Sequence, residues 1–120
     1  MATGPMERES IYLDERMEVI SNKKNAFYYC KMENKTAEGY FFKAYFITGE
    51  VKMEGTYLDD QMEMAHGIFT FYYREGGVES TGEFRHGKKF GLWQRFNPDG
   101  SEKAEKIYMI DPVLNAILDQ

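Results

Sequence analysis

The same pattern of residues occurs three times in this chain, around the glycines at positions 49, 76 and 100. An aromatic residue stands seven positions before each glycine, a second stands four positions before it, and a third follows eight positions after it. The residues seven positions before are Phe42, Phe69 and Trp93. Those four positions before are Tyr45, Tyr72 and Phe96, and those eight positions after are Tyr57, Phe84 and Tyr108. The units are 27 and then 24 residues apart, a period typical of proteins built from small repeated supersecondary structures.

Each unit is predicted to be a β-hairpin with a glycine in its turn, where a positive φ is required. The segment after each glycine alternates in polarity, which indicates an antiparallel strand with one face in water. One predicted face carries Val51, Met53, Gly55 and Tyr57 in the first unit, and Val78, Ser80, Gly82 and Phe84 in the second. The opposite face carries Glu50, Lys52, Glu54 and Thr56, and then Gly77, Glu79, Thr81 and Glu83.

A glycine in the middle of each of these strands stands two residues before an aromatic residue. Gly55 precedes Tyr57 in this way, and Gly82 precedes Phe84. Glycine weakens a strand unless something packs on it, so we expect each to make room for a neighbouring ring. Lys106 stands where the third unit would have this glycine, which predicts that the array ends there.

The segments before the turn glycines are apolar at consecutive positions. Ile68 and Tyr72 are expected on one face, and Phe69 and Phe71 on the other. One face must form the core, and the other must be covered by more chain, covered by a partner, or left as an aromatic platform.

The remaining segments complete the predicted fold. Strands are expected at 11–14, 17–20 and 27–32, followed by a polar loop at 33–37. Asp111 and Pro112 predict the start of a short helix. The predicted fold is therefore all-β, an antiparallel meander of repeated hairpins with roughly seven to nine strands and a short C-terminal helix. Its predicted organisation is a tail at 1–10, a single β-repeat domain at 11–108, and a short helix or linker stub at 109–120.

Composition excludes several classes of function. The 120 residues are 42% hydrophobic, which is enough for a small core, and the net charge of −5 gives no global basis for binding nucleic acid. No apolar run is long enough to span a bilayer. Cys30 is the single cysteine, so it cannot form an internal disulfide, and its apolar neighbours predict a buried or half-buried thiol.

No residue pattern points to catalysis, a cofactor or a metal. His66 and His86 each precede a glycine in a turn, and neither has the spacing of a metal ligand. Asp59, Asp60 and Glu63 lack the pattern of a Ca²⁺-binding loop. The strand glutamates fall on the predicted wet face, where cross-strand pairing accounts for them. We therefore predict no catalytic, cofactor-binding or metal-binding residues.

The string from Gly82 to Trp93, GEFRHGKKFGLW, resembles a MORN-type repeat of the bacterial kind. The arrangement from Ile11 to Tyr108 also resembles the repeat-containing N-terminal regions of envelope proteins from Bacteroidetes-like bacteria. This resemblance implies a scaffold for protein association, with lipid contact in some members, and a periplasmic or cell-envelope location. It offers no catalytic residues. Lys106 departs from the repeat pattern.

The function predicted from these features is a non-catalytic protein-interaction or scaffolding module. Its partner would be another protein or a second copy, bound through an aromatic sheet face or an edge strand, and an anionic lipid headgroup is a further candidate. Basic and aromatic residues concentrate in one region of the sequence. There Arg85, Lys88, Lys89 and Arg95 are expected to lie near Tyr72, Trp93 and Phe96. The candidate partner-binding residues are Trp93, Tyr72, Tyr45, Phe96, Lys88 and Lys89. The alternatives are a lipid-headgroup or glycan-binding accessory domain, and a small hydrolase.

Overall fold

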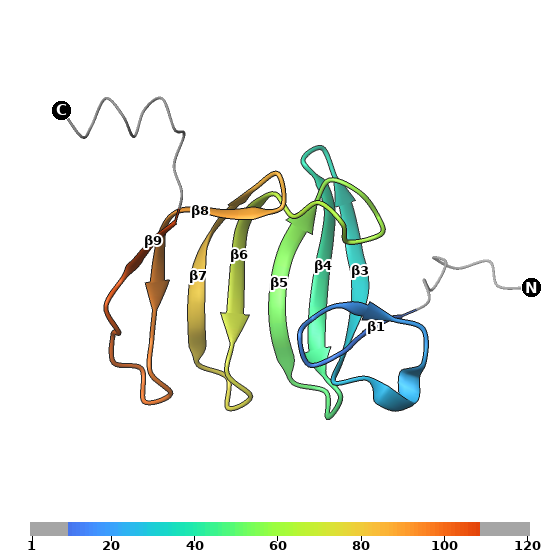
Figure 1. The fold of residues 1–120 in the computed structure, drawn as a ribbon, viewed down its shortest axis with the longest axis horizontal. Coiled ribbons are helices and arrows are strands. Elements are labelled where there is room, and N and C mark those ends of the chain that lie inside the picture. Colours follow the sequence, from blue (N-terminus) through green and yellow to red (C-terminus); the bar gives the residue numbers. More distant parts are fainter. Residues whose placement is uncertain (1–9, 109–120) are drawn as a thin grey trace, which may run out of the picture.

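A computed structural model describes residues 10–108 as one nine-stranded antiparallel sheet (Figure 1). Its strand order, β2-β1-β3-β4-β5-β6-β7-β8-β9, follows the chain apart from the exchange of the first two strands. The strands are β1 Ile11–Leu13, β2 Val19–Ile20, β3 Tyr28–Thr36, β4 Gly39–Phe46, β5 Val51–Tyr57, β6 Gly67–Tyr72, β7 Val78–Arg85, β8 Lys88–Arg95 and β9 Lys106–Tyr108. The predicted all-β meander is confirmed, and the predicted C-terminal helix lies outside the described residues.

The three turns that the glycines predict are built alike. Gly49, Gly76 and Gly100 all have positive φ, at 107°, 107° and 89°. In each turn the glycine N–H donates to the carbonyl three residues earlier, over 2.8, 2.9 and 2.9 Å. The residue at that earlier position also donates its own N–H to the carbonyl that follows the glycine. Because the three turns are alike, the strand after each turn pairs in the same register with the strand before it. The repeat in the sequence is therefore also a repeat in the structure.

A β-bulge follows each of the first two turns. The register shifts between Ala44 and Tyr45 where β4 pairs with β5, so Lys52 is the extra residue. The shift between Phe71 and Tyr72 makes Glu79 the extra residue of β7. A bulge places two consecutive side chains on one side of a sheet. Lys52 therefore faces the rings of Tyr28 and Phe46, which lie 5.9 and 5.6 Å from its Nζ.

These bulges correct the predicted alternation in both repeats. Val51 pairs with Tyr45, and Val78 pairs with Tyr72, so both valines lie on the face opposite Met53. Met53 and Gly55 lie on the buried face as predicted. The extra residue shifts the alternation by one position. Residues of the strand that precede it therefore point to the face opposite the predicted one.

The core lies on one face of the sheet, which we call the inner face, and its rings pack on the mid-strand glycines. A Cβ at Gly55 would overlap the ring of Phe69, and a Cβ at Gly82 would overlap the indole of Trp93. The predicted role of these glycines is thus confirmed. The buried residues of the core are Leu13, Cys30, Phe42, Ala44, Met53, Ala65, Phe69 and Trp93. The exposed opposite side is called the outer face.

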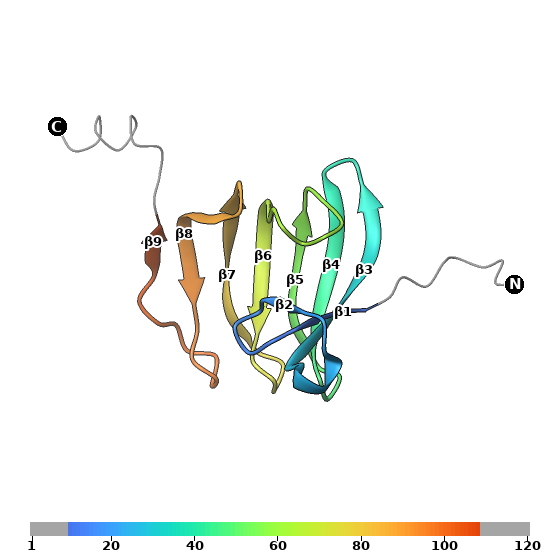
Figure 2. The same ribbon diagram turned by 45° about the vertical axis from the view of Figure 1, so that its right-hand side comes forward.

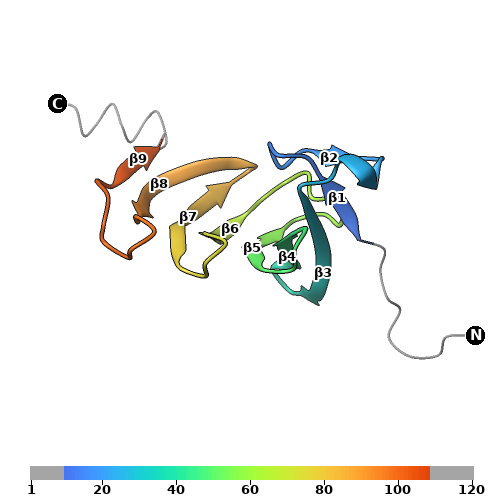
Figure 3. The same ribbon diagram turned by 90° about the horizontal axis from the view of Figure 1, so that it is seen from below.

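Two segments cover the inner face over the N-terminal half of the sheet. The β1–β2 hairpin lies across β3–β5, and the loop between β5 and β6 approaches from the same side (Figures 1 and 3). Leu13 of the hairpin is 1% exposed, and Ala65 of the loop is 7% exposed. Among residues 10–108 no such cover lies over β8 and β9, and Figure 2 shows these two strands clear of the hairpin.

Two predicted segments differ from the structure. The polar segment 33–37 does not form a loop, because β3 continues to Thr36 through a bulge between Met32 and Asn34. This segment extends the β3–β4 hairpin, and most of its polar side chains are exposed to solvent, as polar residues in an antiparallel strand can be. The predicted strand at 17–20 is shorter, because Met17 has a φ of 67° and belongs to the turn.

Candidate functional site

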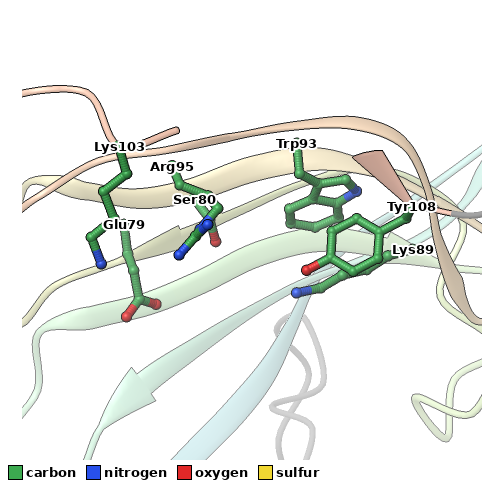
Figure 4. A pocket seen from close by; sticks show the side chains of 7 residues that line it. All are labelled: Glu79, Ser80, Lys89, Trp93, Arg95, Lys103 and Tyr108. Carbon is green, nitrogen blue, oxygen red and sulfur yellow. The ribbon is translucent and has the colours of Figure 1, made fainter. Parts of the chain in front are cut away.

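The uncovered part of the inner face forms a shallow groove of about 240 Å³ over β7, β8 and β9 (Figure 4). We call it the C-terminal groove. Its lining residues are Glu79, Ser80, Lys89, Trp93, Arg95, Lys103 and Tyr108. Three of the seven are cations and two are aromatic. Figure 4 shows these side chains extending to the same side of the strands.

The register of the sheet places each lining residue. Lys89 pairs with Phe84, whose ring packs against the core, so the lysine also points inward. Tyr108 pairs with Gly91, and Trp93 pairs with Lys106, which puts both rings on the inner face of the last two strands. The bulge in β7 brings Glu79 to this face. The groove therefore follows from strand pairing and not from a long loop.

Lysine side chains surround the two rings. The Nζ atom of Lys89 lies 4.6 Å from the centre of the Trp93 ring and 5.0 Å from that of Tyr108. The Nζ atom of Lys106 lies 5.4 Å from the Tyr108 ring. An ammonium held over an aromatic face is attracted by the ring, typically by about 0.5–1 kcal/mol at an exposed site. The rings thus fix where the positive charges stand.

The groove carries a net positive charge in an acidic chain. Its only carboxylate among the lining residues, that of Glu79, lies 3.3 Å from the Nζ of Lys52, whose side chain is 15% exposed. This ion pair with Lys52 offsets the negative charge of Glu79. The positive charges of Lys89, Arg95 and Lys103 would then be available to a ligand. Arg95 donates to the Ala104 carbonyl over 3.4 Å, which anchors the guanidinium at the end of the groove.

Trp93 is a core residue that shapes the groove. It is 1% exposed, and its Nε1 donates to the Glu83 carbonyl over 3.1 Å. Its ring meets that of Tyr108 edge to face, with centres 6.0 Å apart at 76°. A partner would meet Lys89 and Tyr108 directly, while Trp93 positions both.

The structure brings together only two of the six predicted contact residues, Lys89 and Trp93. Tyr45 lies on the outer face, where its ring stacks on Tyr29 at 5.2 Å and its hydroxyl donates to Glu33 over 3.2 Å. Burial and the nearby Glu33 charge raise the pKa of Tyr45. Tyr45 and the groove therefore belong to opposite faces.

Tyr72 also lies on the outer face. Its hydroxyl donates to Glu54 over 2.6 Å, and Glu54 in turn lies 3.7 Å from the Nζ of Lys43. The hydrogen bond to Glu54, together with burial, raises the pKa of Tyr72 to about 12. This ordered chain across β4, β5 and β6 accounts for Tyr72 without a ligand.

Phe96 and Lys88 stand apart from the groove. Phe96 follows β8, and its carbonyl accepts a hydrogen bond from the Tyr73 hydroxyl over 2.7 Å. Lys88 begins β8 opposite Arg85 and is exposed in the turn. The predicted aromatic and basic cluster is thus divided among the two faces and a turn.

Sequence reasoning missed Glu79, Lys103 and Tyr108 as site residues, although a signal for two of them was present. Lys52, Glu79 and Lys103 each stand three residues after a turn glycine. Lys52 and Glu79 are the two bulge residues, and Lys103 occupies the equivalent place after the third turn. Residues at one repeat position take equivalent places in successive strands, so the shared position of these three charged residues was the signal.

The remaining chemistry-bearing residues include two histidines, Asp59 and Cys30. No group of three metal-ligating residues occurs within residues 10–108. His66 and His86 have ring centres 5.7 Å apart. The Asp59 carboxylate accepts backbone N–H groups of its own loop, over 2.8–3.1 Å. Cys30 is fully buried, as predicted, and burial raises its pKa to about 12.

Comparison with known proteins gives no relative for this chain. No family model, curated protein or solved structure matches it. Among the described residues, no helix has the length and apolar character needed to cross a membrane.

Proposed function

We propose that this protein is a non-catalytic interaction module of MORN-like repeats that binds an acidic protein partner in the C-terminal groove. The observation that carries the proposal is the difference between the two halves of the inner face. The N-terminal half is closed by the protein's own hairpin and loop, while the C-terminal half presents Lys89, Arg95 and Lys103 around Tyr108. Within residues 10–108 the inner face is covered at one end and uncovered at the other, and an uncovered face of this kind is suited to a partner.

Charge selects the class of partner. The whole chain has a net charge of −5, so a cationic groove is a local exception that an acidic surface would find by electrostatic steering. The shallow form of the groove favours a protein segment over a small molecule, since small ligands are usually enclosed by deeper pockets. Binding through exposed cations weakens as salt screens them.

A lipid headgroup or a glycan is the second candidate, and the exposed part of Tyr108 beside Lys89 favours it. A sugar ring would pack on the tyrosine, and a phosphate would pair with the lysine. These ligands can be distinguished from an acidic peptide, because a neutral glycan needs no positive charge and a lipid headgroup can be displayed on a vesicle.

Fluorescence anisotropy with a labelled glutamate-rich peptide tests the proposal directly. A variant with Lys89→Glu, Arg95→Glu and Lys103→Glu should lose binding. Its control carries Lys23→Glu, Lys24→Glu and Lys31→Glu, which make the same change of charge at exposed residues away from the groove. Equal loss in both variants would show that only net charge matters and would refute the groove. Vesicles with anionic lipid and a glycan array, run with the same variants, test the second candidate.

A further inference from the structure

We infer that the acidic partner binds as an extended strand that pairs with the free edge of β9, with acidic and apolar side chains in alternation. This inference rests on the proposed function and specifies the form of the partner. It concerns an edge that is three residues long, from Lys106 to Tyr108.

The edge of β9 away from β8 has no partner strand within residues 10–108, since β9 pairs only with β8 there. An unpaired strand edge presents N–H and C=O groups in the register that another strand requires. Main-chain hydrogen bonds would supply affinity, and side-chain pockets on each face would supply specificity.

The two faces beside this edge differ in chemistry. On the inner face stand Lys106 and Tyr108, with Lys89 5.0 Å from the tyrosine ring. On the outer face Ile107 pairs with Leu92, and their exposed fractions are 74% and 51%. Since the side chains of an added strand alternate between the faces, its acidic residues would meet the lysines while its apolar residues cover Ile107.

Pairing of two copies through β9 is disfavoured by the same charges. Two β9 edges in antiparallel pairing would bring together two groups that each contain Lys89 and Lys106. Like charges across a strand pair are destabilising. Lysine on an edge strand commonly prevents such pairing, and here it also selects an acidic strand over an apolar one.

The test compares short peptides of equal composition. The first alternates glutamate and valine, and the second has all its glutamates in one block followed by all its valines. We expect the alternating peptide to bind the full chain about tenfold more tightly. Equal affinity for both would overturn strand pairing, while loss of both in the charge-reversed groove variant would still support the proposed function.

Backbone methylation provides a second readout that does not depend on charge. In an alternating peptide the glutamate amides point to one edge and the valine amides to the other. N-methylation of one set should therefore abolish most of the binding, while methylation of the other set should have little effect. If neither set matters, the peptide does not pair as a strand. If both peptides and both methylated forms fail to bind the unmodified protein, the proposed function fails as well.

A protein variant separates the outer face from the groove. Ile107→Thr keeps a β-branched residue in β9, leaves the charges unchanged and replaces apolar surface by a hydroxyl group. It should weaken the alternating peptide several-fold and leave the block peptide unchanged. Equal weakening of both peptides would contradict the assignment of Ile107, and hydrogen exchange at β8 and β9 would verify that the strand pair is intact.

Discussion

The indole ring of Trp93 lies face-on against the backbone of Gly82, so closely that a Cβ on that glycine would overlap several ring atoms. Gly82→Ala should therefore destabilise the protein by about 1–3 kcal/mol, because the largest buried side chain must move away from its neighbours. The free energy of unfolding from a denaturant titration, followed by Trp93 fluorescence, measures this change.

Gly77→Ala is the matched control for this substitution. A Cβ at Gly77 would have one ordinary contact, 3.9 Å from the Pro98 carbonyl oxygen. We expect little change in stability there. If Gly77→Ala and Gly82→Ala changed the free energy of unfolding by the same amount, the general effect of exchanging glycine for alanine would explain both, and the ring contact would not.

The predictable part of this fold is the part that repeats. Gly55 and Gly82, each two residues before an aromatic, predicted ring packing that the structure confirms on Phe69 and Trp93. These features depend on local backbone geometry and on neighbouring strands, which a repeat brings together in a fixed order.

The bulges and the cover over the core could not be predicted in the same way. Lys52 and Glu79 reach the inner face because one residue is inserted into each ladder, and no alternation pattern shows an insertion. The division of the candidate contacts has a different cause, which alternation along one strand does predict. Tyr45 and Tyr72 stand three residues after the buried rings of Phe42 and Phe69, and an odd spacing places them on the opposite face. The cover formed by the β1–β2 hairpin depends on a long-range contact of Leu13.

The thiol of Cys30 should be unreactive in the folded protein. It is fully buried, and burial raises its pKa to about 12, while alkylation requires the thiolate. Iodoacetamide at neutral pH should modify the protein only in denaturant, as mass spectrometry would show. Modification of the native protein at the rate of the denatured one would mean that β3 opens readily.

Asp59 should hold the loop that covers the core. Burial alone would raise the pKa of this carboxyl, but backbone N–H donors from Glu63, Met64 and Gln61 outweigh burial and lower it. Asp59→Ala should cost about 1–2 kcal/mol, because three N–H groups lose a charged acceptor in a partly exposed loop. Asp60→Ala is the control, since within residues 10–108 its carboxylate accepts only the Gln61 side chain. Thermal unfolding of the two variants distinguishes them.

The same carboxyl predicts a loss of stability in acid. A lowered pKa in the folded state means that the contribution is present above the unfolded pKa near 3.8 and is lost as pH falls through the folded value. The difference in unfolding free energy between the unmodified protein and Asp59→Ala should therefore shrink in strong acid. A difference that is constant with pH would show that the charge of Asp59 does not matter.

The hydrogen bond between Tyr72 and Glu54 predicts a change at the alkaline end. The 2.6 Å bond and burial raise the pKa of Tyr72 to about 12, above its ordinary value of 10. Its stabilising contribution is then full below pH 10 and is lost as pH rises through the folded pKa. Glu54→Gln removes the negative charge while keeping an acceptor, so Tyr72 should ionise at lower pH. Phenolate absorbance against pH measures this, with Tyr72→Phe identifying the signal. An unchanged titration in Glu54→Gln would show that burial, and not the carboxylate, holds the proton on Tyr72.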